Sequence, residues 1–481
     1  MFVQRPLDGA VVLIEREPLV AAKHLLNAGA RTVDEHLVQV PARPDARVVV
    51  ADGVPMNGAE AARAVADVQA KGADFVMLLH GGFTMGDVAR EIARAPLPMG
   101  VWATPEPTLI DDIQLNNFVS LNMSMSIVRG LRDLSTHPVQ WYLGAPGEAA
   151  LEKRMGQTIR ALTAKKALNG AKIGVIGGLA MTFYNMEVST DALMRQLGVW
   201  CEHIDIHHMT DLMAAQSQAD VDAELAAMSN AAEVRGVSDA QMALTARASL
   251  ALRAIAATGG YDALTVSDWP ALQDNPGMHP GAAFSWLEEN DGLPVASEGD
   301  ILGAVTQLVA KSLTGKVGCL LDMTSPDFER DRILMWHGGG GPLYMAKDSV
   351  AWINHPMIGR GTEAGPIYGA IADYEFAHGA CTVIRVSRHG TARFAVEGQV
   401  SEGPAPGFTG CRGWIGGFSS ADGPCSAEDV VTSVMEQGLE HHFILVPGLH
   451  RAVFEEFAQW CGMASLPVIP SHNGLPEGAA L

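Results

Sequence analysis

Residues Leu293–Asp322, LPVASEGDILGAVTQLVAKSLTGKVGCLLD, contain the pattern that decides the expected fold. A short apolar strand leads to Glu298, and a helix follows, because apolar residues recur at helical spacing at Ile301, Val305, Leu308, Val309 and Leu313. A second apolar strand ends at Asp322. This order predicts a βαβ unit with two parallel strands about 4.8 Å apart. Glu298 and Asp322 would then share the carboxyl edge of the sheet, where α/β proteins bind ligands.

Two carboxylates at one sheet edge repel each other unless they share a cation, so we favour a divalent-metal site. The alternative is that acidic residues after a strand simply cap the next helix. Asp300, which directly precedes the helix, fits that capping role better than Glu298 does. Asp322 is followed by MTSPD, which carries no strong helix-start signal, so the capping alternative does not explain it.

The composition describes a well-buried globular protein with a strongly acidic balance. Hydrophobic residues make up 48% of the 481 residues and charged residues 18%, which excludes a disordered chain. The length suggests two to four domains. The formal net charge of −21 leaves no basic stripe for nucleic acid or an anionic membrane. We expect neutral small molecules or cations as ligands; a strongly anionic substrate would need a local Arg or Lys pocket.

Neither a secretion signal nor a membrane anchor is expected. The first residues, MFVQRPLDGAVVLIERE, do not combine a basic region with a cleavable apolar segment. We find no apolar run of about 20 residues. The six cysteines are scattered without a CxxC pair, which favours reduced thiols. Together these features predict a cytoplasmic protein.

The sequence divides into three blocks with different patterns of apolar and turn residues, and these blocks predict three domains. Apolar strands alternate with Ala-rich amphipathic segments in the first two blocks, which is typical of a parallel, doubly wound α/β sheet covered by helices. After Pro326, Gly-rich turns and shorter β-like segments take over. We therefore expect an N-terminal α/β domain over 1–165, a second α/β domain with the acidic ligands over 166–330, and a mostly β C-terminal domain over 331–481.

Three histidines are candidates for the same site. His337 ends a short apolar strand before four glycines, which let the backbone approach a ligand closely. His441 and His442 open the strand HHFILV, and imidazole is a common partner of carboxylates around a divalent ion. Because side chains alternate along a strand, only one of these two should face the site. In isolation, each histidine could also be an ordinary hydrogen-bonded residue.

Several segments, taken in order, resemble the L-fucose isomerase/L-arabinose isomerase superfamily, particularly its fucose isomerase branch. The resemblance covers most of the chain and is carried by MGVWATPEP with Glu106, KIGVIGGLAMTFYNMEVSTDALMRQLGV, YDALTVSDWPALQDNPGMHPGAAFSWLEENDGLPVASEGDILGAV, CTVIRVSRHGTARFAVEG and HHFILVPG. The chain departs from the family at three places. Ser267 and Ser297 stand where cysteine is common, and His279 lies in a stretch that is more apolar in the family.

The resemblance implies a ligand set. Glu298 and Asp322 take the positions of the two carboxylate ligands, and the His441/His442 pair supplies the histidine, for which we favour His442. It also implies a divalent metal, most commonly Mn²⁺, and a homo-oligomer, a hexamer or a related assembly. A neighbouring subunit would contribute residues to the active site, and Trp102 is a candidate to line it from that subunit. His337 and His441 are further candidates for substrate binding.

The implied activity is that of an aldose–ketose isomerase, an intramolecular oxidoreductase of carbohydrate metabolism. The metal would polarise an open-chain sugar of the fucose or arabinose type, and Glu298 and Asp322 would move a proton between C2 and C1 through an enediol. One rival is another metal-dependent reaction, such as epimerisation, on a modified sugar or sugar acid. The other is a non-catalytic sugar-binding protein, which would not need carboxylates and a histidine converging on one point.

Overall fold

The chain forms two compact units, residues 1–167 and 168–481, and each is described by itself. The computed structural model describes residues 7–15, 46–51, 55–130, 138–357 and 369–471. The boundary expected near residue 330 stays a prediction. No helix in the described ranges is long and apolar enough to cross a bilayer. All six cysteines lie in these ranges, and all are free thiols.

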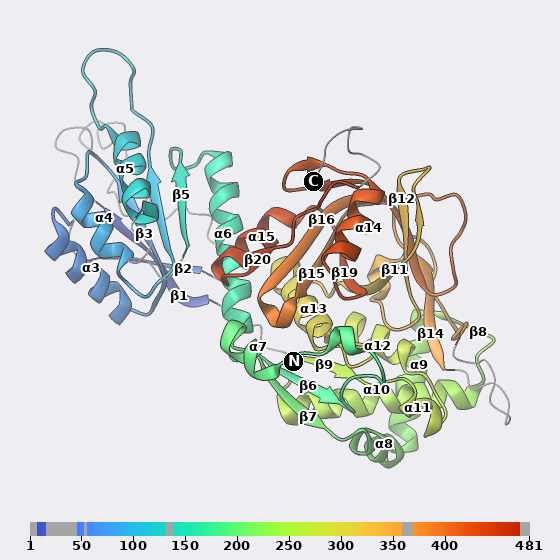
Figure 1. Cartoon of the computed structure of the whole chain (residues 1–481). Helices are drawn as coiled ribbons and strands as arrows, with labels where there is room; N and C mark the ends of the chain where they lie inside the picture. The colour runs from blue at the N-terminus through green and yellow to red at the C-terminus, as the bar shows by residue number, and fades with distance from the viewer. Residues whose placement is uncertain (1–6, 16–45, 52–54, 131–137, 358–368, 472–481) are drawn as a thin grey trace. The chain divides into compact units, whose positions relative to one another are not determined.

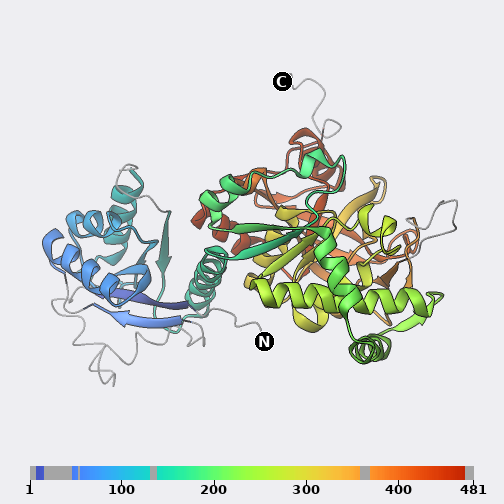
Figure 2. The ribbon, with the colours of Figure 1, turned by 90° about the horizontal axis from the view of Figure 1, so that it is seen from below.

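The first unit is a five-stranded parallel sheet with helices packed on it (Figure 1). The strand order is β2-β1-β3-β4-β5, with β1 Leu7–Glu15, β2 Ala46–Val50, β3 Ala73–His80, β4 Met99–Ala103 and β5 Val139–Leu143. Three helices lie side by side against it (Figure 2): α3 Gly58–Ala70, α4 Gly86–Ala93 and α5 Asn117–Gly130. The helix α6, Ala149–Leu168, ends the unit. The expected parallel α/β architecture is confirmed here.

The second unit opens with a four-stranded parallel sheet in the order β10-β9-β6-β7. Its strands are β6 Lys172–Ile176, β7 Trp200–Ile204, β9 Ala263–Val266 and β10 Val295–Ala296. The helices of this part include α7 Thr190–Leu197, α8 Ile206–Ala215, α9 Gln218–Ala231, α10 Asp239–Gly259, α12 Gly281–Trp286 and α13 Ile301–Thr314. A second parallel α/β sheet was the sequence-based expectation, and it is confirmed.

A closed six-stranded antiparallel barrel follows, so the β-rich C-terminal region is also confirmed. The order is β16-β15-β19-β11-β12-β17, and β17 pairs with β16 to close the ring. The strands are β11 Cys319–Asp327, β12 Arg332–His337, β15 Gly379–Ser387, β16 Ala392–Ser401, β17 Cys411–Ser420 and β19 His442–Pro447. Closure pairs the strand edges that an open sheet would expose. On one side β17 continues into β14 Ala370–Glu375, β13 Ala351–Asn354 and β8 Glu233–Arg235.

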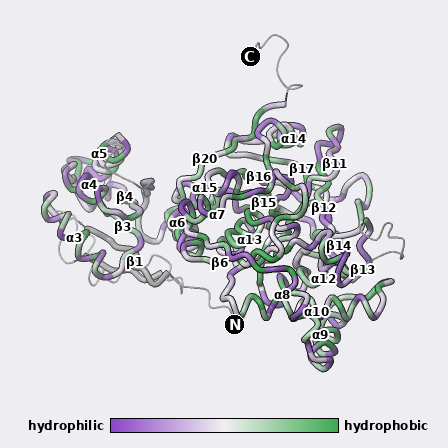
Figure 3. The backbone as a smooth tube through the Cα atoms, turned by 60° about the horizontal axis from the view of Figure 1, so that its bottom comes forward, coloured by the Kyte–Doolittle hydropathy of each residue, from purple (hydrophilic) through white to green (hydrophobic). Residues whose placement is uncertain are grey.

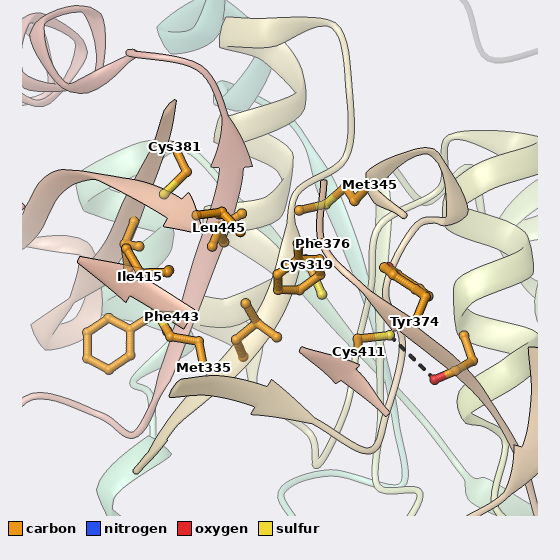
Figure 4. Packing of buried hydrophobic residues seen from close by; sticks show 14 of the residues in the cluster. Cys319, Met335, Met345, Tyr374, Phe376, Cys381, Cys411, Ile415, Phe443 and Leu445 are labelled. Carbon is orange, nitrogen blue, oxygen red and sulfur yellow. Dashed lines mark hydrogen bonds between the residues drawn. The ribbon is translucent and has the colours of Figure 1, made fainter. Parts of the chain in front are cut away.

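One apolar cluster holds the barrel together. Figure 4 shows part of it, with side chains from five barrel strands and from the segments next to them: Cys319, Met335, Met345, Tyr374, Phe376, Cys381, Cys411, Ile415, Phe443 and Leu445. The helix α14, Ala427–Glu436, adds Ala427 and Val430 to the cluster. A second helix, α15 Arg451–Trp460, packs against β16. Burial of these side chains leaves the opposite faces of β11 and β19 free to carry polar groups.

The predicted βαβ unit is wrong in one respect. The first strand, β10, pairs in parallel with β9 in the four-stranded sheet. The second strand, β11, belongs to the barrel and pairs antiparallel with β12 and β19. The intervening helix is real, but local periodicity cannot reveal that its two flanking strands enter different sheets. Glu298 and Asp322 therefore do not share a sheet edge.

Helix α13 lies between the two sheets and joins them. Eleven of its 14 residues are buried, as expected for a mostly apolar helix between two layers, and it is largely green in Figure 3. It packs against β9 and β10 on one side and against β15 and β19 on the other. Asp300 is its N-cap and accepts a hydrogen bond from the Gly303 N–H at 2.8 Å, so the predicted capping role is confirmed.

Gly299 is the glycine on which this junction depends. Its φ is +75°, and a β-carbon there would collide with the carbonyl oxygen of Gly178. We expect Gly299→Ala to lower the free energy of unfolding by roughly 3 kcal/mol or more, because strain and overpacking add. Gly315→Ala is the matched control, with φ +79° but nothing within 4 Å. Gly315→Ala should lower the free energy of unfolding by only roughly 1–2 kcal/mol. Equal losses in urea unfolding would show that the collision does not matter.

Candidate functional site

The strand register of the barrel places Asp322 and His442 side by side. The two residues are direct partners across the antiparallel pair β11–β19. Directly paired residues project to the same face of a sheet, and their neighbours project to the other. Accordingly, Leu321 and Phe443 enter the apolar cluster, whereas His442 contacts Asp300 at the N-terminus of α13 and Asp322 lies beside His442. Glu298 reaches the same point from the segment between β10 and α13.

The three side chains come together around the imidazole of His442. Its Nε2 lies 3.3 Å from Glu298 Oε2 and 3.7 Å from Asp322 Oδ1. In the described part of the chain, His442 Nε2 and Asp322 Oδ1 are buried atoms without a hydrogen-bond partner. Buried polar atoms are nearly always satisfied, so these two neighbouring atoms are available to bind a ligand.

The donors fit a metal ion. Two overlapping groups have ligand atoms within 4.8 Å of one another, and His442 belongs to both. One group is Glu298, His337 and His442, and the other is Asp322, His441 and His442. Carboxylate oxygens and imidazole nitrogens are ligands for Mn²⁺, Fe²⁺ and Zn²⁺. These groups could therefore bind a divalent metal; Glu298 and Asp322 belong to different groups, which share His442.

Asp300 orients the central histidine from behind. His442 Nδ1 donates to Asp300 Oδ2 at 3.0 Å, which leaves Nε2 directed at Glu298 and Asp322. The guanidinium of Arg385, on β15, binds both Asp300 oxygens at 2.6 and 3.0 Å. Sequence reasoning assigned Asp300 only to capping and missed Arg385. An arginine inside the apolar strand CTVIRVS was the available signal, because buried arginine requires a charged partner.

The charges of this cluster control its ionisation. Burial alone would lower the pKa of His442, but the hydrogen bond to Asp300 and the nearby carboxylates of Glu298 and Asp322 raise that pKa to about 10. Burial would raise the pKa of Asp300, but Arg385 and His442 outweigh it and hold that pKa well below its usual range. For Glu298, burial is likewise outweighed by His441 and His442, which lower its pKa.

His441 lies at the more open side of the site. Its Nε2 is 3.4 Å from Glu298 Oε2, and its Nδ1 accepts a hydrogen bond from the Asn185 amide at 2.9 Å. The expectation that only one histidine of the pair faces the site is wrong. His441 precedes β19, so the alternation of the strand does not apply to it, and both rings reach the same carboxylate. Its side chain is 37% exposed, whereas that of His442 is fully buried.

His337 ends β12 and borders the cluster. Its ring lies 5.2 Å from that of His442, edge to face. Its Nδ1 accepts a hydrogen bond from the Gly339 N–H at 2.7 Å, so the imidazole proton is on Nε2. Burial lowers the pKa of His337, which favours this neutral form. The ring can therefore offer an N–H donor to a ligand.

Trp102 lies in β4 of the first unit. It is 2% exposed, and its indole N–H donates to the Gly144 carbonyl at 2.9 Å. Within its own unit it is thus a core residue. The sequence analysis also expects Trp102 to line the active site of a neighbouring subunit, and this stays a prediction.

Comparison with known proteins now adds to this geometry. The chain is distantly similar to sulfoquinovose isomerases. It is 25% identical to that of Priestia aryabhattai over 354 residues, which cover 73% of this chain and 75% of the relative. It is also 25% identical to that of Alkalicoccus urumqiensis over 401 residues, 82% and 85% of the two chains. The enzyme of Clostridium sp. (strain MSTE9) is 24% identical over 364 residues, 74% and 77% of the two chains.

These relatives are sugar isomerases, which supports an isomerase of carbohydrate metabolism for this chain at distant identity. No family model matches the chain. The expected isomerase chemistry is therefore supported in general terms, and the narrower resemblance to the fucose isomerase branch stays a prediction.

The Asp300–Arg385 pair should dominate the stability of the site. Asp300→Asn and Arg385→Gln should each lower the free energy of unfolding by roughly 3–5 kcal/mol, because each removes the shortest partner of a fully buried charge. The loss of unfolding free energy in the double variant should be about 1–3 kcal/mol smaller than the sum of the two single losses. Denaturant unfolding measures all three variants.

The control is Asp373→Asn, which breaks the Arg412–Asp373 pair. That pair is equally short, at 2.6 Å, but partly exposed. Loss of this pair should lower the free energy of unfolding by about 1 kcal/mol. Two results would contradict the claim that the Asp300–Arg385 pair dominates the stability of the site. One is a double variant whose loss equals the sum of the two single losses, and the other is a single-variant loss as small as that of Asp373→Asn.

Proposed function

We propose that this protein is a divalent-metal-dependent aldose–ketose isomerase that acts on a free, open-chain sugar. The observation that carries the proposal is the pair of buried unsatisfied atoms, His442 Nε2 and Asp322 Oδ1, next to the Glu298 carboxylate. The names of the relatives supply the reaction class. A non-catalytic binding protein would have no use for such a converging set of donors.

Glu298, Asp322 and His442 are the proposed ligands, and Mn²⁺ is the proposed metal. Coordination by His442 uses the neutral imidazole with its proton on Nδ1, the atom that faces Asp300. A bound divalent ion supplies Lewis-acid chemistry, because it polarises the carbonyl and stabilises negative charge on the sugar oxygens. Among first-row metals, carboxylate-rich sites suit Mn²⁺, and the family resemblance implies it as well.

The side chains of this chain would move the proton. An aldose becomes a ketose when a base removes the C2 proton and the proton is returned to C1 through an enediol. Glu298 and Asp322 are the proposed carriers, and a positioned carboxylate typically contributes about 10²–10⁴-fold to the rate. The N–H groups of His337 and His441 are directed toward the cluster, so they are the proposed donors to substrate hydroxyls. Trp102 of a neighbouring subunit would close the site in a homo-oligomer.

The substrate panel starts from the sugar in the relatives' names. Sulfoquinovose carries a sulfonate, an anion that the net charge of −21 does not favour unless a local cation binds it. L-fucose, L-arabinose and D-arabinose complete the aldose panel, and a sugar acid represents the rival chemistry. Ketose formation from any of the aldoses supports the proposal, whereas turnover of the sugar acid alone would replace it.

Glu298→Gln tests the chemistry. We expect Mn²⁺-dependent ketose formation by the parent and a loss of roughly 10²–10⁴-fold or more in kcat for the variant, since it removes a proposed proton carrier. Glu289→Gln is the control, because Glu289 instead accepts a hydrogen bond from the Tyr344 N–H, outside the site. The sugar panel is assayed after removal of metal with chelator and after addition of Mn²⁺. An active, chelator-resistant Glu298→Gln protein would refute the proposed role.

Asp322→Asn tests the metal site without relying on turnover. The metal-free variant loses the attraction between Asp322 Oδ1 and His442 Nε2, which are 3.7 Å apart, so its free energy of unfolding should fall by roughly 1–3 kcal/mol. Mn²⁺ at about 100 times its Kd should stabilise the parent by about 2.7 kcal/mol. The variant should gain much less at the same Mn²⁺ concentration, as measured by thermal and denaturant unfolding. Equal stabilisation of both proteins would exclude Asp322 as a ligand.

A further inference from the structure

We propose that Asp268 is the positioning residue that holds Glu298 in the backbone conformation directing its carboxylate to the metal site, and that His279 and Ser297 hold Asp268 in turn. The consequence for metal binding rests on the function proposed above. The positioning itself concerns only the residues of this chain and can be tested without a metal.

The backbone of Glu298 is in an uncommon conformation. Its φ is +63°, a left-handed region that a residue with a β-carbon rarely adopts. Such conformations persist only where the surroundings hold them, and they are concentrated at functional sites. Here the Glu298 N–H donates to Asp268 Oδ1 at 2.6 Å, and the Glu298 carbonyl accepts from the Ala180 N–H at 2.9 Å. Both polar groups of this peptide segment are therefore fixed.

The other oxygen of Asp268 is fixed as well. Oδ2 accepts from the Ser297 hydroxyl at 2.7 Å and lies 3.0 Å from His279 Nε2. His279 Nδ1 accepts from the Gly281 N–H at 3.2 Å, so the imidazole proton is on Nε2 and is donated to Asp268. Both oxygens of Asp268 are thus occupied by protein donors. This carboxylate is therefore a support for Glu298 and not a further metal ligand.

Burial makes this support rigid. Asp268 and His279 are both almost completely buried, and the His279 ring packs edge to face against His355 at 4.6 Å. A buried carboxylate is stable only while its donors are present. Removing one donor should therefore displace Asp268 or admit water, and either change releases the Glu298 backbone. The groups behind a metal ligand commonly affect metal affinity by about 10–100-fold.

Asp268→Asn is the main variant. The amide keeps the shape but turns an acceptor into an N–H₂ group that must face either Glu298 N–H or His279 N–H. We expect Mn²⁺ affinity, measured by isothermal titration calorimetry, to fall about 10–100-fold. A crystal structure of the variant should show Glu298 out of the positive-φ conformation. Glu288→Gln is the matched control, a buried glutamate that binds the Gln307 amide on α13 away from the cluster.

Two variants of His279 separate positioning from simple packing. His279→Gln retains a side-chain N–H that can reach Asp268, whereas His279→Leu has a similar volume and no donor. The glutamine variant should keep near-parental Mn²⁺ affinity, and the leucine variant should lose about tenfold. If Asp268→Asn does not fold, this pair and Ser297→Ala, which removes a single donor, provide the same comparison.

The outcomes separate the two proposals. If the parent binds no Mn²⁺, the proposed function fails, and the crystal structure of Asp268→Asn still decides the positioning. Glu298 at its parental φ in that structure overturns the inference, and a displaced Glu298 supports it. If the parent binds Mn²⁺ and Asp268→Asn and His279→Leu bind it equally well, the inference is also overturned, and the proposed function stands.

Discussion

The carboxylate of Asp300 is the interaction on which the site depends. It caps the N-terminus of α13, binds both ends of the Arg385 guanidinium and accepts the Nδ1 proton of His442. These contacts connect the helix between the two sheets to two strands of the barrel. A single group thus fixes the orientation of the histidine and the junction of the two sheets. Asp300 and Arg385 are both fully buried, so removing either charge takes from the other its shortest ion-pair contact in a place that water does not reach.

The location of the site follows from this junction. Barrel closure sets the register that pairs Asp322 with His442, and the apolar residues that alternate with them fill the cluster on the opposite face. The parallel sheet delivers Glu298 and α13 from the other side. The second unit thus contributes donors from two different sheets, held by one buried helix. An ion between Glu298 and Asp322 would reduce the repulsion between them, as the unsatisfied atoms of the cluster also suggest.

Local sequence patterns were sufficient for some features and not for others. The Asp300 cap, helix α13, the strand end at His337 and the two α/β sheets with a β-rich C-terminal region follow from periodicity and capping rules. The barrel partner of β11 does not, because sheet membership is decided by contacts distant in sequence. Ser297 and His279, two departures from the family pattern, looked unrelated along the chain. In the structure they bind the same Asp268 oxygen, which no spacing rule would reveal.

The central claim is that Glu298, Asp322 and His442 hold a divalent metal. The most direct measurement is a crystal structure of the Mn²⁺-soaked protein with anomalous scattering data. The account predicts an anomalous peak bonded to His442 Nε2 and to oxygens of Glu298 and Asp322, with His442 Nδ1 still bound to Asp300. A well-ordered site without such a peak, in crystals that bind Mn²⁺ elsewhere, would contradict it.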